Sequence, residues 1–147
     1  MIVTGGQDGS GNQLKSSQIV LVDGSPVTNG PELPEPRYGQ CVAYDKENDV
    51  IFLIRGWNTG GRSQEVWKFK DPKTLILNGT THMNTPRYDA GCGIVRSKHH
   101  DGRPLIVIGG DSSTSSAGSK ICEFLDYTKS DQWQFCSKSN SSFLVLH

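Results

Sequence analysis

A pattern that recurs about every 50 residues limits the folds open to this chain more than any other feature of its sequence. The tripeptide Pro-Arg-Tyr at residues 36–38 returns 50 positions later at residues 86–88, and a stretch of small residues with one cysteine follows each copy. A second apolar run then ends on glycine in both units, and the opening residues of the chain end in the same way. These glycines are Gly5, Gly6, Gly56, Gly109 and Gly110.

Each unit contains four short apolar runs. The second run, residues 50–54 or 105–108, is apolar at every position, which indicates a strand buried on both faces. The third run starts with serine each time, at Ser17, Ser63 and Ser119, and a turn containing aspartate follows it. A fourth, weaker run closes each unit. Because no window keeps a 3.6-residue period, we predict an all-β fold of four-stranded antiparallel sheets.

The pattern resembles kelch repeats, in which a glycine pair ends the second strand and aromatic residues occupy the third and fourth strands. Trp67 stands in the third run of the middle unit and Trp133 in the fourth run of the last unit. The middle unit departs from the family pattern, because Arg55 replaces the first glycine and Leu77 the tryptophan. The resemblance implies a kelch-type β-propeller, whose blades are four-stranded antiparallel sheets.

On this resemblance the chain comprises about three repeats of a propeller. Residues 1–35 are expected to form an incomplete blade, residues 36–85 and 86–136 two blades, and residues 137–147 a tail or the start of the next blade. Three blades are too few to close a ring, which usually needs four to eight. Two resolutions stay open. The chain is a fragment of a longer protein, or two copies form a homodimer in which residues 142–146 complete the partner's first blade.

Charge and hydropathy exclude two classes of partner. Fifteen basic residues balance 15 acidic ones, so no basic footprint for nucleic acid is present. No apolar run approaches the ~20 residues that span a bilayer, so we predict no membrane span. The first residues do not resemble a signal peptide, which fits either an intracellular protein or a missing start, and the repeats favour the second interpretation.

Four cysteines form an even set, which suggests disulfides in an extracellular protein. Cys41 and Cys92 stand at similar places in successive units. Because facing sheets pack ~10 Å apart and a disulfide needs Cα atoms within about 7 Å, we expect no bridge between them unless both lie very near the propeller axis. Cys122 and Cys136 lie on adjacent strands, where a disulfide is geometrically allowed. The alternative is four free thiols. No pair has C-x-x-C spacing, so we predict no metal site.

Two sequons, at Asn78 and Asn140, are candidate N-glycosylation sites if the protein is secreted. Two sequons in a chain of this length are also close to what chance gives. Residues 30–37 with Cys41 resemble extracellular animal kelch-repeat proteins more than the cytosolic adaptors. Together with the cysteines, these features favour an extracellular location over a cytoplasmic one.

The candidate binding residues lie at the start of the innermost strands and in the loops that follow the second strands. In kelch adaptors, arginines at the positions of Arg37 and Arg87 line the mouth of a central pocket and hold acidic partner side chains, a role that suits the bidentate guanidinium. The structural alternative is that each arginine caps carbonyl groups and stacks on the tyrosine after it. The predicted binding set is Arg37, Tyr38, Arg62, Arg87 and Tyr88.

We therefore predict a scaffold that binds protein or glycan partners through loops 7–15, 58–63 and 111–118, with no catalytic residue and no cofactor. One alternative is a fragment of a kelch-fold enzyme of the sugar oxidase or sialic-acid isomerase type. Another is part of a ubiquitin-ligase substrate adaptor. The adjacent His99 and His100 fall in a polar connection and are expected to be solvated. The ligand set of kelch-fold copper oxidases has no counterpart among the histidines.

Overall fold

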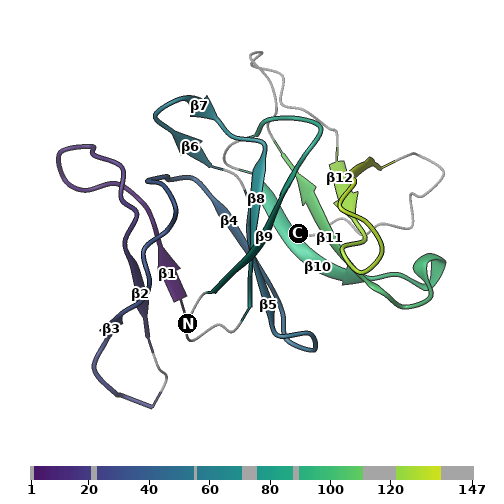
Figure 1. Cartoon of the computed structure of the whole chain (residues 1–147), viewed down its shortest axis with the longest axis horizontal. Helices are drawn as coiled ribbons and strands as arrows, with labels where there is room; N and C mark the ends of the chain where they lie inside the picture. Colours follow the sequence, from purple (N-terminus) through teal and green to yellow (C-terminus); the bar gives the residue numbers. More distant parts are fainter. Residues whose placement is uncertain are drawn as a thin grey trace.

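The protein is an all-β chain of antiparallel sheets (Figure 1). A computed structural model describes residues 2–20, 23–54, 56–70, 76–87, 90–110 and 122–136. One short 3-10 helix, η1 (Lys98–His100), connects two strands, and the described residues include no helix long and apolar enough to cross a membrane. Three sheets follow one another along the sequence, and the middle one lies between the other two (Figure 1).

The first sheet has the strand order β1-β2-β3 and comprises β1 (Ile2–Thr4), β2 (Ser17–Ile19) and β3 (Thr28–Asn29). The central sheet has the order β4-β5-β8-β9. Its strands are β4 (Cys41–Asp45), β5 (Val50–Ile54), β8 (Glu65–Lys70) and β9 (Ile76–His82). In both sheets each strand pairs with the next strand of that sheet along the chain, as short antiparallel connections allow.

The C-terminal sheet repeats this arrangement with the order β10-β11-β12-β13. Its strands are β10 (Gly91–Arg96), β11 (Pro104–Gly109), β12 (Cys122–Leu125) and β13 (Gln134–Phe135). A separate hairpin of β6 (Trp57–Asn58) and β7 (Gly61–Arg62) extends from the central sheet between β5 and β8. The sequence predicted a polar loop at this place, so the hairpin is an addition to the expected fold.

The core lies between facing sheets, and β5 supplies both of its halves. All five residues of β5 are buried, as the uninterrupted apolar run predicted. Phe52 and Ile54 pack against the C-terminal sheet, whereas Ile51 and Leu53 pack against the first sheet, because alternate side chains of a strand point to opposite faces. Each such side chain stabilises the fold by about 1.5–3 kcal/mol on burial, so β5 fastens the central sheet to both neighbours.

The two tryptophans of the repeat pattern are divided between these two interfaces. Trp67 on β8 is buried with Phe69 and Leu33 in the cluster between the first and central sheets. Trp133, just before β13, is buried with residues of the cluster between the central and C-terminal sheets. Each tryptophan therefore fills space between sheets and takes no part in an exposed surface.

The repeat glycines bring the end of a second strand close to the backbone that precedes an innermost strand. Gly5, Gly56 and Gly110 all have positive φ, at 61°, 125° and 123°. A Cβ on Gly56 would lie 2.6 Å from the carbonyl oxygen of Tyr38, one on Gly5 would lie 2.5 Å from that of Arg37, and one on Gly110 would overlap Ala90. Only glycine combines this conformation with this close approach.

We predict that Gly56→Ala destabilises the protein more than Gly6→Ala. Both glycines have positive φ, so each substitution carries a strain of about 1–3 kcal/mol. A Cβ on Gly6 has no heavy atom within 4 Å, whereas one on Gly56 overlaps the Tyr38 carbonyl. Urea denaturation of both variants measures the difference, and equal losses would show that the close approach carries no energetic weight.

Two disulfides are present, and one of them corrects the sequence prediction. The Cys122–Cys136 bridge links β12 to the residue that follows β13, with Cα atoms 5.3 Å apart. Cys41 and Cys92, expected to stay apart, are also bonded, with Cα atoms 6.0 Å apart. Cys41 is third after the Tyr of its Pro-Arg-Tyr element and Cys92 is fourth. Because a shift of one residue turns a side chain to the other face, the two thiols point toward each other across β4 and β10.

Candidate functional site

Two ordered loops lie at the same end of the sheets and form the candidate site (Figure 1). One is the segment 5–16 between β1 and β2, and the other is the β6–β7 hairpin. The hairpin follows β5, the second strand of the central sheet. Segment 5–16 follows β1, the strand of the first sheet that corresponds to β5 in the repeat. The equivalent segment of the last unit, 111–118, falls outside the described residues.

Segment 5–16 is organised around Asp8. The Asp8 carboxylate accepts hydrogen bonds from the backbone N–H groups of Ser10 and Asn12, at 2.9 and 2.8 Å, and from the Asn12 amide at 2.8 Å. The hydrogen bond from the Asn12 side chain is the largest cause that lowers the pKa of Asp8 below its usual 3.8. A β-bridge between Gln7 and Gln13 closes the base of the loop. The exposed loop is therefore held in one shape by its own polar groups.

The β6–β7 hairpin is fixed both internally and to the segment before β4. Asn58 accepts a hydrogen bond from the Gly60 N–H at 2.9 Å and donates one to the Glu35 carboxylate at 2.9 Å. Tyr38 and Trp57 exchange backbone hydrogen bonds of 3.2 and 2.8 Å. Burial raises the pKa of Glu35, but hydrogen bonds from Asn58 and Arg37 outweigh it, so the pKa lies below 4.5 and the carboxylate is charged at neutral pH.

Arg37 lies beneath this end of the sheets and is completely buried. Its guanidinium forms ion pairs with Glu35 and, at 3.1 Å, with Glu65, and it stacks on the Trp67 ring at 3.7 Å. Its backbone carbonyl accepts a hydrogen bond from the Gly6 N–H at 2.9 Å. Arg37 thus joins segment 5–16 to the central sheet, and it is linked to the hairpin through Glu35, which accepts a hydrogen bond from Asn58.

Arg87 occupies the equivalent place in the next unit and is also completely buried. It donates to the Gly110 carbonyl at 2.8 Å and forms an ion pair of 3.0 Å with Glu123, whose side chain is fully buried as well. The second carboxylate oxygen of Glu123 accepts a hydrogen bond from the Asn84 N–H at 2.8 Å. The pair is therefore closed off on both sides by backbone groups.

These contacts correct the binding role predicted for Arg37 and Arg87. A guanidinium with no exposed surface cannot receive a partner's carboxylate, and both groups already have carboxylates from this chain. The structural alternative holds in part, since Arg87 caps a carbonyl as expected. The aromatic neighbour of Arg37 is Trp67 and not the tyrosine that follows it.

The other predicted binding residues have mixed outcomes. Tyr38 and Arg62 are both partly exposed. They lie at the end of the sheets that carries segment 5–16 and the β6–β7 hairpin, which we call the hairpin end. Tyr88 lies outside the described residues, and so does the sequon residue Asn140. Asn78 is exposed on β9, at a distance along the chain from the hairpin and on a different strand. Among the described members of the predicted set, Tyr38 and Arg62 therefore keep exposed surface, whereas Arg37 and Arg87 have none.

Sequence reasoning missed the acidic partners, although a signal for one of them exists. Counted from the serine that starts the third run, Trp67 is the fourth residue after Ser63 and Glu123 the fourth after Ser119. Glu123 thus stands at the repeat position that Trp67 occupies in the preceding unit. Trp67 stacks on Arg37, and Glu123 pairs with Arg87. A lone charged residue in an apolar strand usually indicates a buried partner of opposite charge.

A second polar cluster lies at the opposite end of the sheets. Asp45, buried at the end of β4, accepts hydrogen bonds from Tyr127, from Asn48 at 2.6 Å and from Arg96 at 3.1 Å. Burial raises the pKa of Asp45. The hydrogen bonds from these donors and the positive charge of Arg96 lower the pKa by more than burial raises it, so the net shift is downward. Through the Asp45–Arg96 and Asp45–Tyr127 contacts, the cluster ties the central sheet to the C-terminal sheet.

Among the described residues, no group of three or more histidine, cysteine, aspartate or glutamate side chains is arranged to hold a metal ion. His99 and His100 lie in η1, and the ring of His100 contacts Phe124 edge-on at 5.4 Å. Comparison with protein-family models finds no match for this chain, and comparison with curated proteins finds none either.

Proposed function

We propose that this chain is part of a kelch-type β-propeller that binds protein or glycan partners through its hairpin end. The observation that carries the proposal is the pair of ordered, polar and partly exposed loops at one end of stacked sheets: segment 5–16 and the β6–β7 hairpin. Rigid scaffolds commonly present their binding residues on such loops. Because their internal hydrogen bonds already order these loops, less conformational entropy is lost when a partner binds.

Three features support the propeller part of this proposal. The sheets consist of strands that follow one another in sequence and pair antiparallel, and they stack face to face through apolar side chains. Glycines with positive φ end the second strands in each unit. Disulfides fit an oxidising compartment, so we infer an extracellular protein.

Arg62 is the residue at this end that we expect to contribute most to binding, because arginine is enriched among the residues that dominate interface energies. A display screen of extracellular proteins and glycans identifies ligands, and equilibrium titration then gives Kd for each variant. We expect Arg62→Ala to weaken binding about tenfold, which corresponds to about 1.4 kcal/mol.

Lys46→Ala is the matched control for Arg62→Ala, because Lys46 is an exposed cation in the β4–β5 turn at the opposite end. Thermal unfolding of both variants checks that neither change disturbs the fold. An equal or larger loss of affinity in Lys46→Ala would place the binding surface elsewhere and contradict the proposal.

A further inference from the structure

Asn78 is the extra residue of a β-bulge on β9. In the ladder between β8 and β9, Lys68 pairs with Gly79 and Phe69 with Leu77, so Asn78 has no residue opposite it. Gly79 beside it has a φ of 141°, and a Cβ there would meet no heavy atom within 4 Å. Asn78, Gly79 and Thr80 are all exposed. The sequon is therefore presented on an irregular and accessible piece of backbone.

β9 is also the outer edge of the central sheet among the described strands. Ile76 and Leu77, immediately before Asn78, are 61% and 45% exposed. An edge strand with exposed apolar side chains is a template for pairing with other chains, and proteins usually block such edges. A bulge blocks it in part, and a bulky polar group on Asn78 would block it fully.

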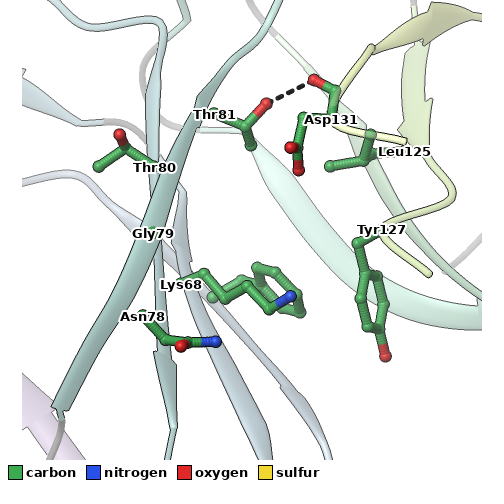
Figure 2. A pocket seen from close by; sticks show the side chains of 9 residues that line it. Lys68, Asn78, Gly79, Thr80, Thr81, Leu125, Tyr127 and Asp131 are labelled. Carbon is green, nitrogen blue, oxygen red and sulfur yellow. Dashed lines mark hydrogen bonds between the residues drawn. The ribbon is translucent and has the colours of Figure 1, made fainter. Parts of the chain in front are cut away.

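A small cleft opens beside Asn78, between β9 and the turn that follows β12 (Figure 2). Its volume is about 210 Å³, and Asn78, Lys68, Thr80, Tyr127 and Asp131 line it. This is smaller than the ~300–1,000 Å³ of ordinary ligand pockets, so the cleft suits a single ring. Thr81 donates a hydrogen bond of 2.7 Å to the Asp131 carbonyl and holds the two walls together (Figure 2).

Tyr127 gives this cleft a fixed aromatic wall. Its ring lies 4.8 Å from that of Phe52, and its hydroxyl donates to Asp45. The Lys68 ammonium lies 5.5 Å from the centre of the same ring. An apolar ring beside an ammonium, a hydroxyl and a carboxylate offers both a flat surface and hydrogen-bond partners, which is the combination that a pyranose ring requires.

We propose that Asn78 carries an N-linked glycan and that the first sugar, N-acetylglucosamine, lies in this cleft against Tyr127. In the transfer step the Asn78 amide nitrogen forms a bond to the anomeric carbon of a polyprenol-pyrophosphate-linked oligosaccharide. The bond from that carbon to the pyrophosphate oxygen breaks, the polyprenol pyrophosphate leaves with the electron pair, and the amide nitrogen loses one proton. No electron is gained or lost overall.

The modification is tested on the full chain secreted from a eukaryotic cell with an added leader peptide. Intact mass is measured before and after an amidase that releases N-linked glycans and converts the glycosylated asparagine to aspartate. Peptide mapping then assigns the site. We expect aspartate at position 78 in the wild type and in Thr80→Ser, and asparagine in Thr80→Ala. Unmodified Asn78 in the secreted wild type would overturn the proposal, whatever happens at Asn140.

The position of the first sugar is tested separately by nuclear Overhauser contacts on chain trimmed to one N-acetylglucosamine. We expect contacts between the sugar protons and the Tyr127 ring. We also expect the amidase to release the glycan from native protein several-fold faster in Asp131→Ala than in the wild type. Lys129→Ala, which removes an exposed charge from the same turn outside the cleft, serves as the control. Absence of the contacts together with equal release rates would show that the glycan points into solvent.

Discussion

Replacing Glu123 with alanine is expected to lower the free energy of unfolding by about 3–5 kcal/mol, because it leaves the Arg87 guanidinium buried without a carboxylate. Both side chains are completely buried, and their ion pair spans 3.0 Å. The substitution also removes the acceptor of the Asn84 N–H. Urea denaturation followed by tryptophan fluorescence measures the loss, since Trp133 lies in the adjoining core.

The Arg87→Met, Glu123→Leu double variant separates charge burial from packing. Apolar residues of similar volume often replace a buried ion pair with little loss, so we expect this double variant to be clearly more stable than Glu123→Ala. Glu32→Ala is the matched control, because Glu32 pairs with Lys15 on the surface and such pairs contribute about 0–1 kcal/mol. If Glu123→Ala cost no more than Glu32→Ala, the buried pair would have no special role in stability.

The repeat pattern predicted the sheets well, because side-chain burial and backbone pairing coincide in the inner strands. The apolar run at residues 50–54 is β5, and both of its faces are buried. The outer strands were less predictable. β9 runs from Ile76 to His82, although the apolar residues end at Leu77. Its polar half is held by backbone pairing with β8, which requires no apolar side chain.

The β6–β7 hairpin was missed because its strands are only two residues long and carry no alternating pattern. The Asn-Thr-Gly-Gly sequence at residues 58–61 is nevertheless a turn signal. Gly61, with a φ of 107°, and the Asn58 side chain that accepts from Gly60 fix the turn. Local chemistry of this kind can be read from sequence, whereas the hydrogen bond from Asn58 to Glu35 depends on tertiary contact.

The arginines show where sequence reasoning stops. The repeat located Arg37 and Arg87 at equivalent positions, but exposure cannot be read from a repeat position alone. Their carboxylate partners Glu65 and Glu123 come from 28 and 36 residues further along the chain. Burial follows from packing between neighbouring sheets, which no local pattern encodes. The candidate site therefore keeps Tyr38 and Arg62 and loses the two arginines.

The Cys41–Cys92 bridge was missed because the mean spacing of facing sheets was applied to two adjacent innermost strands. A spacing of ~10 Å describes the mean distance between facing sheets, whereas two adjacent innermost strands approach more closely. The two cysteines also differ by one position relative to the Pro-Arg-Tyr elements, which turns them toward each other. Counting each cysteine from its Pro-Arg-Tyr element would have shown that the two side chains point to opposite faces of their own sheets, and so toward each other.

Removing this bridge with Cys41→Ala and Cys92→Ala is expected to lower the free energy of unfolding by about 4 kcal/mol. The cysteines are 51 residues apart, and closing a loop of that length in the unfolded chain accounts for this magnitude in the chain-entropy model. The Cys122–Cys136 bridge closes only 14 residues, so its removal should cost about 3 kcal/mol. Guanidinium denaturation of both double variants gives the comparison.

The difference between the two bridges is small, so a second readout is needed to separate them. The Cys41–Cys92 bridge cross-links the central and C-terminal sheets, whereas Cys122–Cys136 joins β12 to the residue that follows β13. Loss of the first should therefore increase amide hydrogen exchange along β4 and β10, and loss of the second should act on β12 and β13. Equal exchange in β4 and β10 of both variants would show that noncovalent contacts hold the two sheets together without the bridge, among them the apolar cluster around Phe52, Ile54 and Ile106.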